Sequence, residues 1–346
     1  MTSAIALIAL SATAGLLLMP MVLRYARRRG MLDVPNARSS HSRVTPRGGG
    51  AAIVIVVLVM LAGLAARNPD LHRVAIALAG GGVLVAGVGW IDDLRQVSAL
   101  PRIVVHTVAA VWIVAWIGGM PILALGGATV RLGWVGAVVA CILIAWFINL
   151  YNFMDGIDGI AGTQAVLAAL ALGSLLTAEG DTVLASVCWV LAGAAGAFLV
   201  WNWPPAKIFM GDVGSGFIGM CLGTMAVAAQ NRSALELTVP LVLLGVFIVD
   251  ATATLLRRLL SGERWFDAHR SHAYQRAVQH GFTHRQVTVA VIVVNLGLWV
   301  AAWTMRTSPR MSVPVALGTM AALIGLWAWC IRHLHAGPSE AESNPQ

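Results

Sequence analysis

Charged residues are scarce in this sequence. Only 11% of its 346 residues are charged, whereas 58% are apolar, and the mean hydropathy is +0.80. This composition excludes an ordinary soluble domain, in which about 25% of the residues are charged. We therefore interpret the chain as a membrane protein.

Lysine and cysteine are also rare. Lys207 is the single lysine among 23 basic residues, so the net charge of +8 comes from arginine. The arginines gather in loops, where anionic lipid headgroups and phosphorylated substrates are the expected partners and nucleic acid is not. The four cysteines lie inside apolar runs at spacings that match neither a disulfide framework nor a metal site, so we interpret them as small apolar residues.

Apolar runs, in contrast, are abundant. Each is about 17 to 22 residues long, the length that a helix needs to cross a bilayer. They predict an all-α, polytopic fold with about 11 transmembrane helices in one integral membrane domain, residues 1–334, and a disordered polar tail, residues 335–346. The first run lacks the features of a cleaved signal peptide, so we expect it to be retained. The runs lie near residues 3–23, 48–66, 74–91, 102–119, 134–151, 162–178, 182–201, 213–229, 238–256, 287–305 and 313–331.

Lysine and arginine are divided unequally between alternate loops. With the N-terminus outside, 17 of them fall in cytoplasmic connections and 6 in external ones. Because cytoplasmic loops are enriched in basic residues, this count predicts an external N-terminus and a cytoplasmic C-terminus. Two local features are also predicted, an external hairpin at Gly126 and Gly127 and a helix-capping box from Thr283 to Gln286.

Most acidic residues fall on the predicted cytoplasmic side, in three clusters beside apolar runs. Asp92 and Asp93 end the third run, Asp155 and Asp158 lie in "NFMDGIDGIAG", and Asp212 opens the eighth run in "GDVGSG". Neighbouring carboxylates repel one another unless a cation lies between them, and hard oxygen ligands suit Mg²⁺. The adjacent glycines let backbone amides approach a phosphate. The pattern predicts a Mg²⁺ and phosphate site at the cytoplasmic face.

A single Asp-Gly pair has a simpler interpretation, because both residues are ordinary turn formers. Three such clusters at one membrane face favour a functional site instead, since ionisable residues beside the hydrocarbon core are costly. Asp250 lies inside a run, and two interpretations stay open for it: support of the site or an interhelical hydrogen bond.

An ordered set of motifs between Asp33 and Arg285 resembles a known family. The motifs are "DVPNARSSHSRVTPRGGG", "DDL", "NFMDGIDGIAG", "FMGDVGS" and "HRSHAYQR". Together they resemble the polyprenyl-phosphate N-acetylhexosamine-1-phosphate transferases, glycosyltransferase family 4, and most of all its branch that starts O-antigen synthesis. Many relatives carry "HIHH" where this chain has His272 to Gln275, so only the first histidine matches.

The resemblance implies a reaction and a setting. Such enzymes transfer N-acetylhexosamine 1-phosphate from a UDP-sugar to undecaprenyl phosphate, release UMP and use Mg²⁺ or Mn²⁺. It also implies an active site that faces the cytoplasm from the bacterial inner membrane, in a lipopolysaccharide or related cell-envelope pathway, and a homodimer as a possible assembly. The sugar stays open among N-acetylglucosamine, N-acetylfucosamine and N-acetylquinovosamine.

Specific residues receive roles from this resemblance and from their charge. Asp212 is the expected metal ligand, together with Asn152, and Asp92 is expected to deprotonate or orient the lipid phosphate. A lipid phosphate is already largely ionised at neutral pH, so positioning outweighs proton transfer. The catalytic set is Asp92, Asp93, Asp155, Asp158 and His272. The substrate-binding set is Asn152, Asn202, Phe209, His41, Arg47, Arg102, Lys207, Arg270 and Arg276, in which most arginines have a topology signal as the alternative.

Three other interpretations explain the sequence less well. An ion-coupled secondary transporter also carries intramembrane acids, but near mid-depth and between repeated halves, and the sequence shows no such repeat. A non-catalytic scaffold gives no reason for three carboxylate clusters at one face. A zinc site at His269, His272, His280 and His284 lacks a cysteine or carboxylate at ligand spacing.

Overall fold

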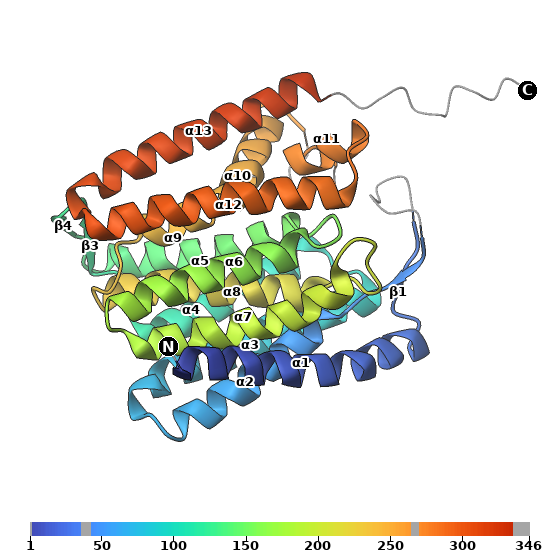
Figure 1. Ribbon diagram of the computed structural model, residues 1–346, viewed down its shortest axis with the longest axis horizontal. Coiled ribbons are helices and arrows are strands. Elements are labelled where there is room, and N and C mark those ends of the chain that lie inside the picture. The colour runs from blue at the N-terminus through green and yellow to red at the C-terminus, as the bar shows by residue number, and fades with distance from the viewer. Residues whose placement is uncertain (1, 36–42, 264–269, 335–346) are drawn as a thin grey trace, which may run out of the picture.

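The computed structural model describes residues 2–35, 43–263 and 270–334. In this part of the chain the fold is all-α apart from two small hairpins, as predicted. The long helices run side by side, with β1 at one end of the bundle and β3 and β4 at the other (Figure 1). The helices are α1 (Thr2–Arg28), α2 (Gly50–Ala65), α3 (His72–Arg95), α4 (Ala99–Ile117), α5 (Val135–Phe153), α6 (Ile160–Ala178), α7 (Thr182–Asn202), α8 (Asp212–Asn231), α9 (Thr238–Leu243), α10 (Gly245–Leu260), α11 (Ala273–Gln279), α12 (His284–Thr307) and α13 (Ser312–His333).

All eleven predicted apolar runs are helical in the described residues, but two of them depart from the expected single span. Nine helices in the described ranges are long and apolar enough to cross a membrane. Helix α2 is shorter, and the ninth run is broken at Leu244 into α9 and α10. At the break, the Leu243 carbonyl accepts a hydrogen bond of 3.1 Å from Gln164 Nε2, which satisfies a backbone group that a continuous helix would have paired internally.

Helix α8 forms the centre of the bundle. Of its span, 94% is buried, whereas 6% of the last span, around α13, is buried. Small residues allow this central position, because they let backbones approach closely. A Cβ at Gly214 would come within 2.5 Å of Gly50 Cα in α2, and one at Gly89 in α3 would come within 2.5 Å of the Asp212 backbone. The start of α8 is therefore held against α2 and α3 at backbone distance.

The short elements follow the local sequence. Strands β3 (Ile122–Leu125) and β4 (Ala128–Arg131) form the predicted hairpin, and Gly126 and Gly127 both have positive φ, as its two-residue turn requires. The predicted capping box is present at the start of α12. At the other end of the bundle, β1 (Leu32–Asp33) pairs with β2 (Thr45–Pro46). Two 3₁₀ turns, Pro69–Leu71 and Pro309–Met311, precede α3 and α13.

Candidate functional site

Asp93 joins the end of α3 to the start of α8. Its carboxylate accepts hydrogen bonds from the backbone amides of Asp212 at 3.1 Å and Val213 at 3.3 Å. These amides belong to the first turn of α8, whose donors have no partner within the helix, so a carboxylate stabilises them. Gly211, with φ of 75° and ψ of 168°, leaves room for this contact. Asp93 therefore sets the position of the neighbouring Asp212.

Arg102, in the first turn of α4, bridges two carboxylates. Its Nη1 lies 3.1 Å from Asp92 Oδ2 and 2.9 Å from Asp212 Oδ2. The other oxygen of Asp92 accepts the Val97 amide at 2.5 Å, which fixes the carboxylate across the α3–α4 connection. A positive group thus lies between two of the three predicted carboxylate clusters, as their mutual repulsion requires.

Asp212 and Asn152 carry oxygen atoms of the kind that a divalent cation such as Mg²⁺ binds. Asn152 and Asp212 line one small cavity, and Asn152 donates its Nδ2 to Ser215 Oγ at 3.1 Å, which leaves its carbonyl oxygen available. No group of three or more His, Cys, Asp or Glu side chains in the described ranges is placed to hold a metal, and His269 of the zinc alternative lies outside those ranges. Mg²⁺ does not require such a group, because it keeps several waters and uses one or two carboxylates with substrate phosphates.

Arg47, in the segment before α2, contacts the end of α3. Its guanidinium donates to the backbone oxygens of Asp92 and Asp93, each at 2.9 Å, and its Nε lies 3.6 Å from Asp93 Oδ1. These carbonyls lie in the last turn of α3, where a cation is favourable. Arg47 therefore supports the Asp92–Asp93 pair directly.

The loop at 154–159 is fastened on two sides by Asp158 and Asn202. Asp158 Oδ2 accepts the Ala206 amide at 3.0 Å and lies 3.4 Å from His284 Nδ1. Asn202 accepts the Gly159 amide at 2.9 Å and donates to the Ile208 carbonyl at 3.0 Å. These contacts of both side chains thus join this loop to the 203–211 segment.

Asp155 differs from the other carboxylates of the site. Its side chain makes no hydrogen bond or ion pair within the part of the chain that the structure describes. Burial, followed by the nearby charges of Asp212, Asp93 and Asp158, raises the pKa of Asp155 well above its ordinary value of 3.8. A carboxylate that is kept unpaired beside others is available to a ligand or a cation.

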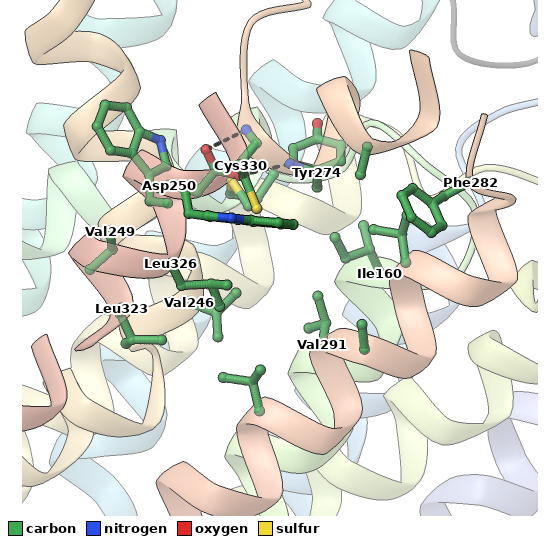
Figure 2. A pocket seen from close by; sticks show the side chains of 18 of the residues that line it. Ile160, Val246, Val249, Asp250, Tyr274, Phe282, Val291, Leu323, Leu326 and Cys330 are labelled. Carbon is green, nitrogen blue, oxygen red and sulfur yellow. Dashed lines mark hydrogen bonds between the residues drawn. The ribbon is translucent and has the colours of Figure 1, made fainter. Parts of the chain in front are cut away.

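Asp250 and His272 support the short helix α11. Asp250 accepts the backbone amides of Ala273 at 2.9 Å and Tyr274 at 3.2 Å, and His272 Nδ1 lies 3.5 Å from it. Tyr274 in turn donates its hydroxyl to the Phe153 carbonyl at 3.0 Å. Figure 2 shows Asp250 and Tyr274 at one end of an apolar cavity of about 380 Å³ between α10, α12 and α13. Asp250 therefore positions α11 against the segment that carries Asn152 and Asp155.

The remaining predicted residues lie at the edge of the site or away from it. Lys207 is exposed, with its Nζ 5.4 Å from the centre of the Trp201 ring, and Phe209 is half-buried, with its backbone bonded to Pro46 and Gly49. Arg276 donates to the Ile331 carbonyl at 2.9 Å, which directs it toward α13. Arg270 is half-buried before α11, and His41 lies outside the described residues.

One residue near Asp212 was not predicted. His106 lines the same small cavity as Asp212 and Asn152. It follows Arg102 by four residues, and residues at this spacing lie on one face of a helix. That spacing was the available signal, but a buried histidine in an apolar run is usually an ordinary core residue.

The fold and the site define a multi-pass membrane protein with a carboxylate and arginine site at the ends of its helices. A model of the family described as "Glycosyl transferase family 4" matches residues 74–230. The chain is 32% identical to a decaprenyl-phosphate N-acetylglucosaminephosphotransferase of Mycolicibacterium smegmatis, over 92% of this chain and 85% of that protein. It is 28% identical to a probable undecaprenyl-phosphate N-acetylglucosaminyl 1-phosphate transferase of Bacillus subtilis, over 85% and 82% of the two chains.

A third relative is the undecaprenyl-phosphate alpha-N-acetylglucosaminyl 1-phosphate transferase of Escherichia coli K12, which is 28% identical over 78% of this chain and 74% of that protein. The matched region contains Asp92, Asp93, Asp155, Asp158 and Asp212. The chain belongs to glycosyltransferase family 4, the polyprenyl-phosphate N-acetylhexosamine-1-phosphate transferases. The predicted family is thereby confirmed.

Proposed function

We propose that this protein transfers an N-acetylhexosamine 1-phosphate from a UDP-sugar to undecaprenyl phosphate and releases UMP. The observation that carries the proposal is the position of Arg102 between Asp92 and Asp212, together with Asp155, a carboxylate that is unpaired among the described residues and whose pKa is raised by burial and by the charge of Asp212. Two phosphate anions must meet in this reaction, so the site has to neutralise and position charge. The names of the relatives given above include a polyprenyl phosphate, and this is why we propose a polyprenyl phosphate as the acceptor.

The reaction exchanges one phosphorus–oxygen bond for another. An oxygen of the lipid phosphate attacks the β-phosphorus of the UDP-sugar, and the bond to the bridging oxygen breaks. That oxygen leaves on UMP with the bonding electrons. Asp92, held by Val97 and Arg102, orients the acceptor phosphate or takes its remaining proton. Arg102 lies where it reaches phosphate oxygens once they enter the space between the carboxylates.

Mg²⁺, with Mn²⁺ as the alternative, would be held by Asp212 and the Asn152 carbonyl oxygen and would neutralise the pyrophosphate. Asp155 would offer a further oxygen to the cation or the substrate, and Asp93 accepts the backbone amide of Asp212 at the N-terminus of α8. Asp158 and Asn202 shape the wall of the nucleotide and sugar pocket, with Phe209 and Lys207 at its edge. Arg47 would support Asp92 and Asp93, and His272, Arg270 and Arg276 would act through α11 and the residues before it.

We also propose where in the cell the protein acts and which way its site faces. The site faces the cytoplasm from the bacterial inner membrane, in a single integral domain of residues 1–334, and the product starts O-antigen or a related cell-envelope glycan. The basic loops support this orientation, because 17 of 23 basic residues fall on the side of the site. A reporter fused after residue 270 is expected to signal from the cytoplasm, and an external signal would refute the orientation.

Exchange of labelled UMP into a UDP-sugar tests the reaction. Membranes that contain the protein are expected to catalyse exchange when undecaprenyl phosphate and Mg²⁺ are both present, and a panel of UDP-N-acetylhexosamines identifies the sugar. Asp212→Asn is expected to abolish exchange. Asp70→Asn is the matched control, because it removes the same charge from an exposed residue of the 3₁₀ turn before α3, and Asp92 and Asp93 lie at the opposite end of that helix. Wild-type exchange by Asp212→Asn would refute the metal assignment.

A further inference from the structure

His106 is a buried histidine of α4 that the proposed reaction does not yet use. Only 6% of it is exposed, and it lines the small cavity that Asp212, Asn152 and Arg102 also line. Its Nδ1 lies 3.2 Å from Asn149 Oδ1 in α5. The ring therefore connects α4 to the helix turn that carries Asn152.

The hydrogen bonds of Asn149 determine where His106 carries its proton. Asn149 Nδ2 donates to the Ala145 carbonyl at 2.7 Å, so the oxygen of the same amide is the atom that faces His106. An amide oxygen only accepts, so His106 Nδ1 must be the donor. In a neutral imidazole the other nitrogen, Nε2, then carries a lone pair.

Nε2 has no hydrogen-bond partner among the residues that the structure describes. It is also not enclosed by apolar atoms, since it is absent from the fully covered polar atoms that lack a partner. A ring nitrogen in an otherwise buried side chain is more stable when it meets a donor. A donor that enters the cavity shared with Asp212 can reach this accessible nitrogen.

We propose that His106 Nε2 accepts a hydrogen bond from a water molecule of the divalent cation held by Asp212 and Asn152. This inference rests on the metal site of the proposed function. Mg²⁺ keeps several waters, and each bound water is a strong donor that needs an acceptor. His106 acts as a positioning residue, because it orients the hydration shell of the cation and leaves the phosphates to Asp92 and Arg102.

Binding of Mn²⁺ to the full-length protein in detergent, followed by electron paramagnetic resonance, tests the inference without turnover. His106→Phe keeps a ring of similar size but removes the lone pair, so the Kd for Mn²⁺ is expected to rise about tenfold. His106→Gln is expected to restore most of the affinity, because one amide donates to Asn149 and accepts on its other side. Thr107→Val changes the exposed neighbouring residue and is the matched control.

The outcomes separate this inference from the proposed function. If the wild-type protein does not bind Mn²⁺, or if Asp212→Asn binds it as well as the wild type, the metal site itself is wrong. If Asp212→Asn loses Mn²⁺ while His106→Phe keeps wild-type affinity, the role of His106 is refuted. Equal weakening in His106→Phe and His106→Gln would refute it as well, because a packing defect alone would explain both.

A second variant keeps the test valid if His106→Phe does not fold. Asn149→Leu leaves the imidazole in place but removes the acceptor that holds the proton on Nδ1. The proton is then free to move to Nε2, so the affinity for Mn²⁺ is expected to fall severalfold. Wild-type affinity in Asn149→Leu, with His106 intact, would contradict the inferred hydrogen bond.

Discussion

Replacement of Gly211 by alanine should break the hydrogen bonds by which Asp93, at the end of α3, holds the first turn of α8. Gly211 has φ of 75° and ψ of 168°, a region that is essentially restricted to glycine and costs other residues about 1–3 kcal/mol. In addition, a Cβ there would come within 2.8 Å of Asp93 Cγ and closer still to Oδ2. The methyl group therefore displaces the carboxylate that holds the Asp212 and Val213 amides.

The size of this effect can be worked out from the two hydrogen bonds. A hydrogen bond to a charged group contributes about 1.5–3 kcal/mol, and a buried charge that loses its partners adds a desolvation cost. Loss of even one bond would thus lower the free energy of unfolding by about 1.5–3 kcal/mol beyond the backbone strain. Asp212 directly follows the substituted residue, so UMP exchange should be lost at the same time.

Gly118→Ala is the matched control. Gly118 has nearly the same backbone angles, φ of 84° and ψ of 156°, but its Cβ would meet only Asn231 Nδ2 at 3.6 Å. Both variants carry the strain, and only Gly211→Ala carries the collision with Asp93. Unfolding in detergent and UMP exchange measure the difference. If the two variants are equally stable and equally active, Asp93 does not hold the start of α8.

Two further predictions concern the loop at 154–159. Asp155→Asn should lower exchange while it stabilises the fold in the presence of EDTA, because the raised pKa of Asp155 means that folding penalises its charged form. The stability of the wild type then falls as the pH rises from about 3.8 through the raised pKa, and this slope should be smaller in Asp155→Asn; an unchanged slope would contradict the assignment. Asn202→Leu leaves the Gly159 amide and the Ile208 carbonyl without their partner, which costs about 1–3 kcal/mol for each group. Unfolding in detergent should therefore show a lower free energy of unfolding than that of the wild type. An unchanged value would show that Asn202 does not hold the loop to the 203–211 segment.

Hydropathy predicted the helices well because it acts locally. A run of apolar residues specifies a helix in a membrane almost independently of its neighbours, since every backbone group must be paired within the segment. The break at Leu244 escaped this reasoning. At the break, Gln164, which lies 79 positions before Leu243, donates its side-chain Nε2 to the Leu243 carbonyl. No window of sequence around Leu244 contains that information.

The site was predicted as a set of residues rather than as a set of roles. The spacing of glycine and aspartate identified Asp93, Asp155 and Asp212, but residue type does not tell whether a carboxylate binds a ligand or a backbone amide. The structure separates these two uses. Asp93 binds the first turn of α8, whereas the Asp155 side chain makes no hydrogen bond or ion pair among the described residues.

Asp93 and Asp250 have the same structural role at the starts of two different helices. Asp93 accepts two amides at the start of α8, and Asp250 accepts two amides at the start of α11. In both cases a side chain of one helix fixes the first turn of another, and the fixed helix carries or adjoins a residue assigned to the site, Asp212 in α8 and His272 before α11. A helix end that is held in this way cannot rotate without breaking two hydrogen bonds to a charge. Asp93 and Asp250 therefore act on backbone amides, whereas Asp212 pairs with Arg102 and the Asp155 side chain makes no hydrogen bond or ion pair among the described residues.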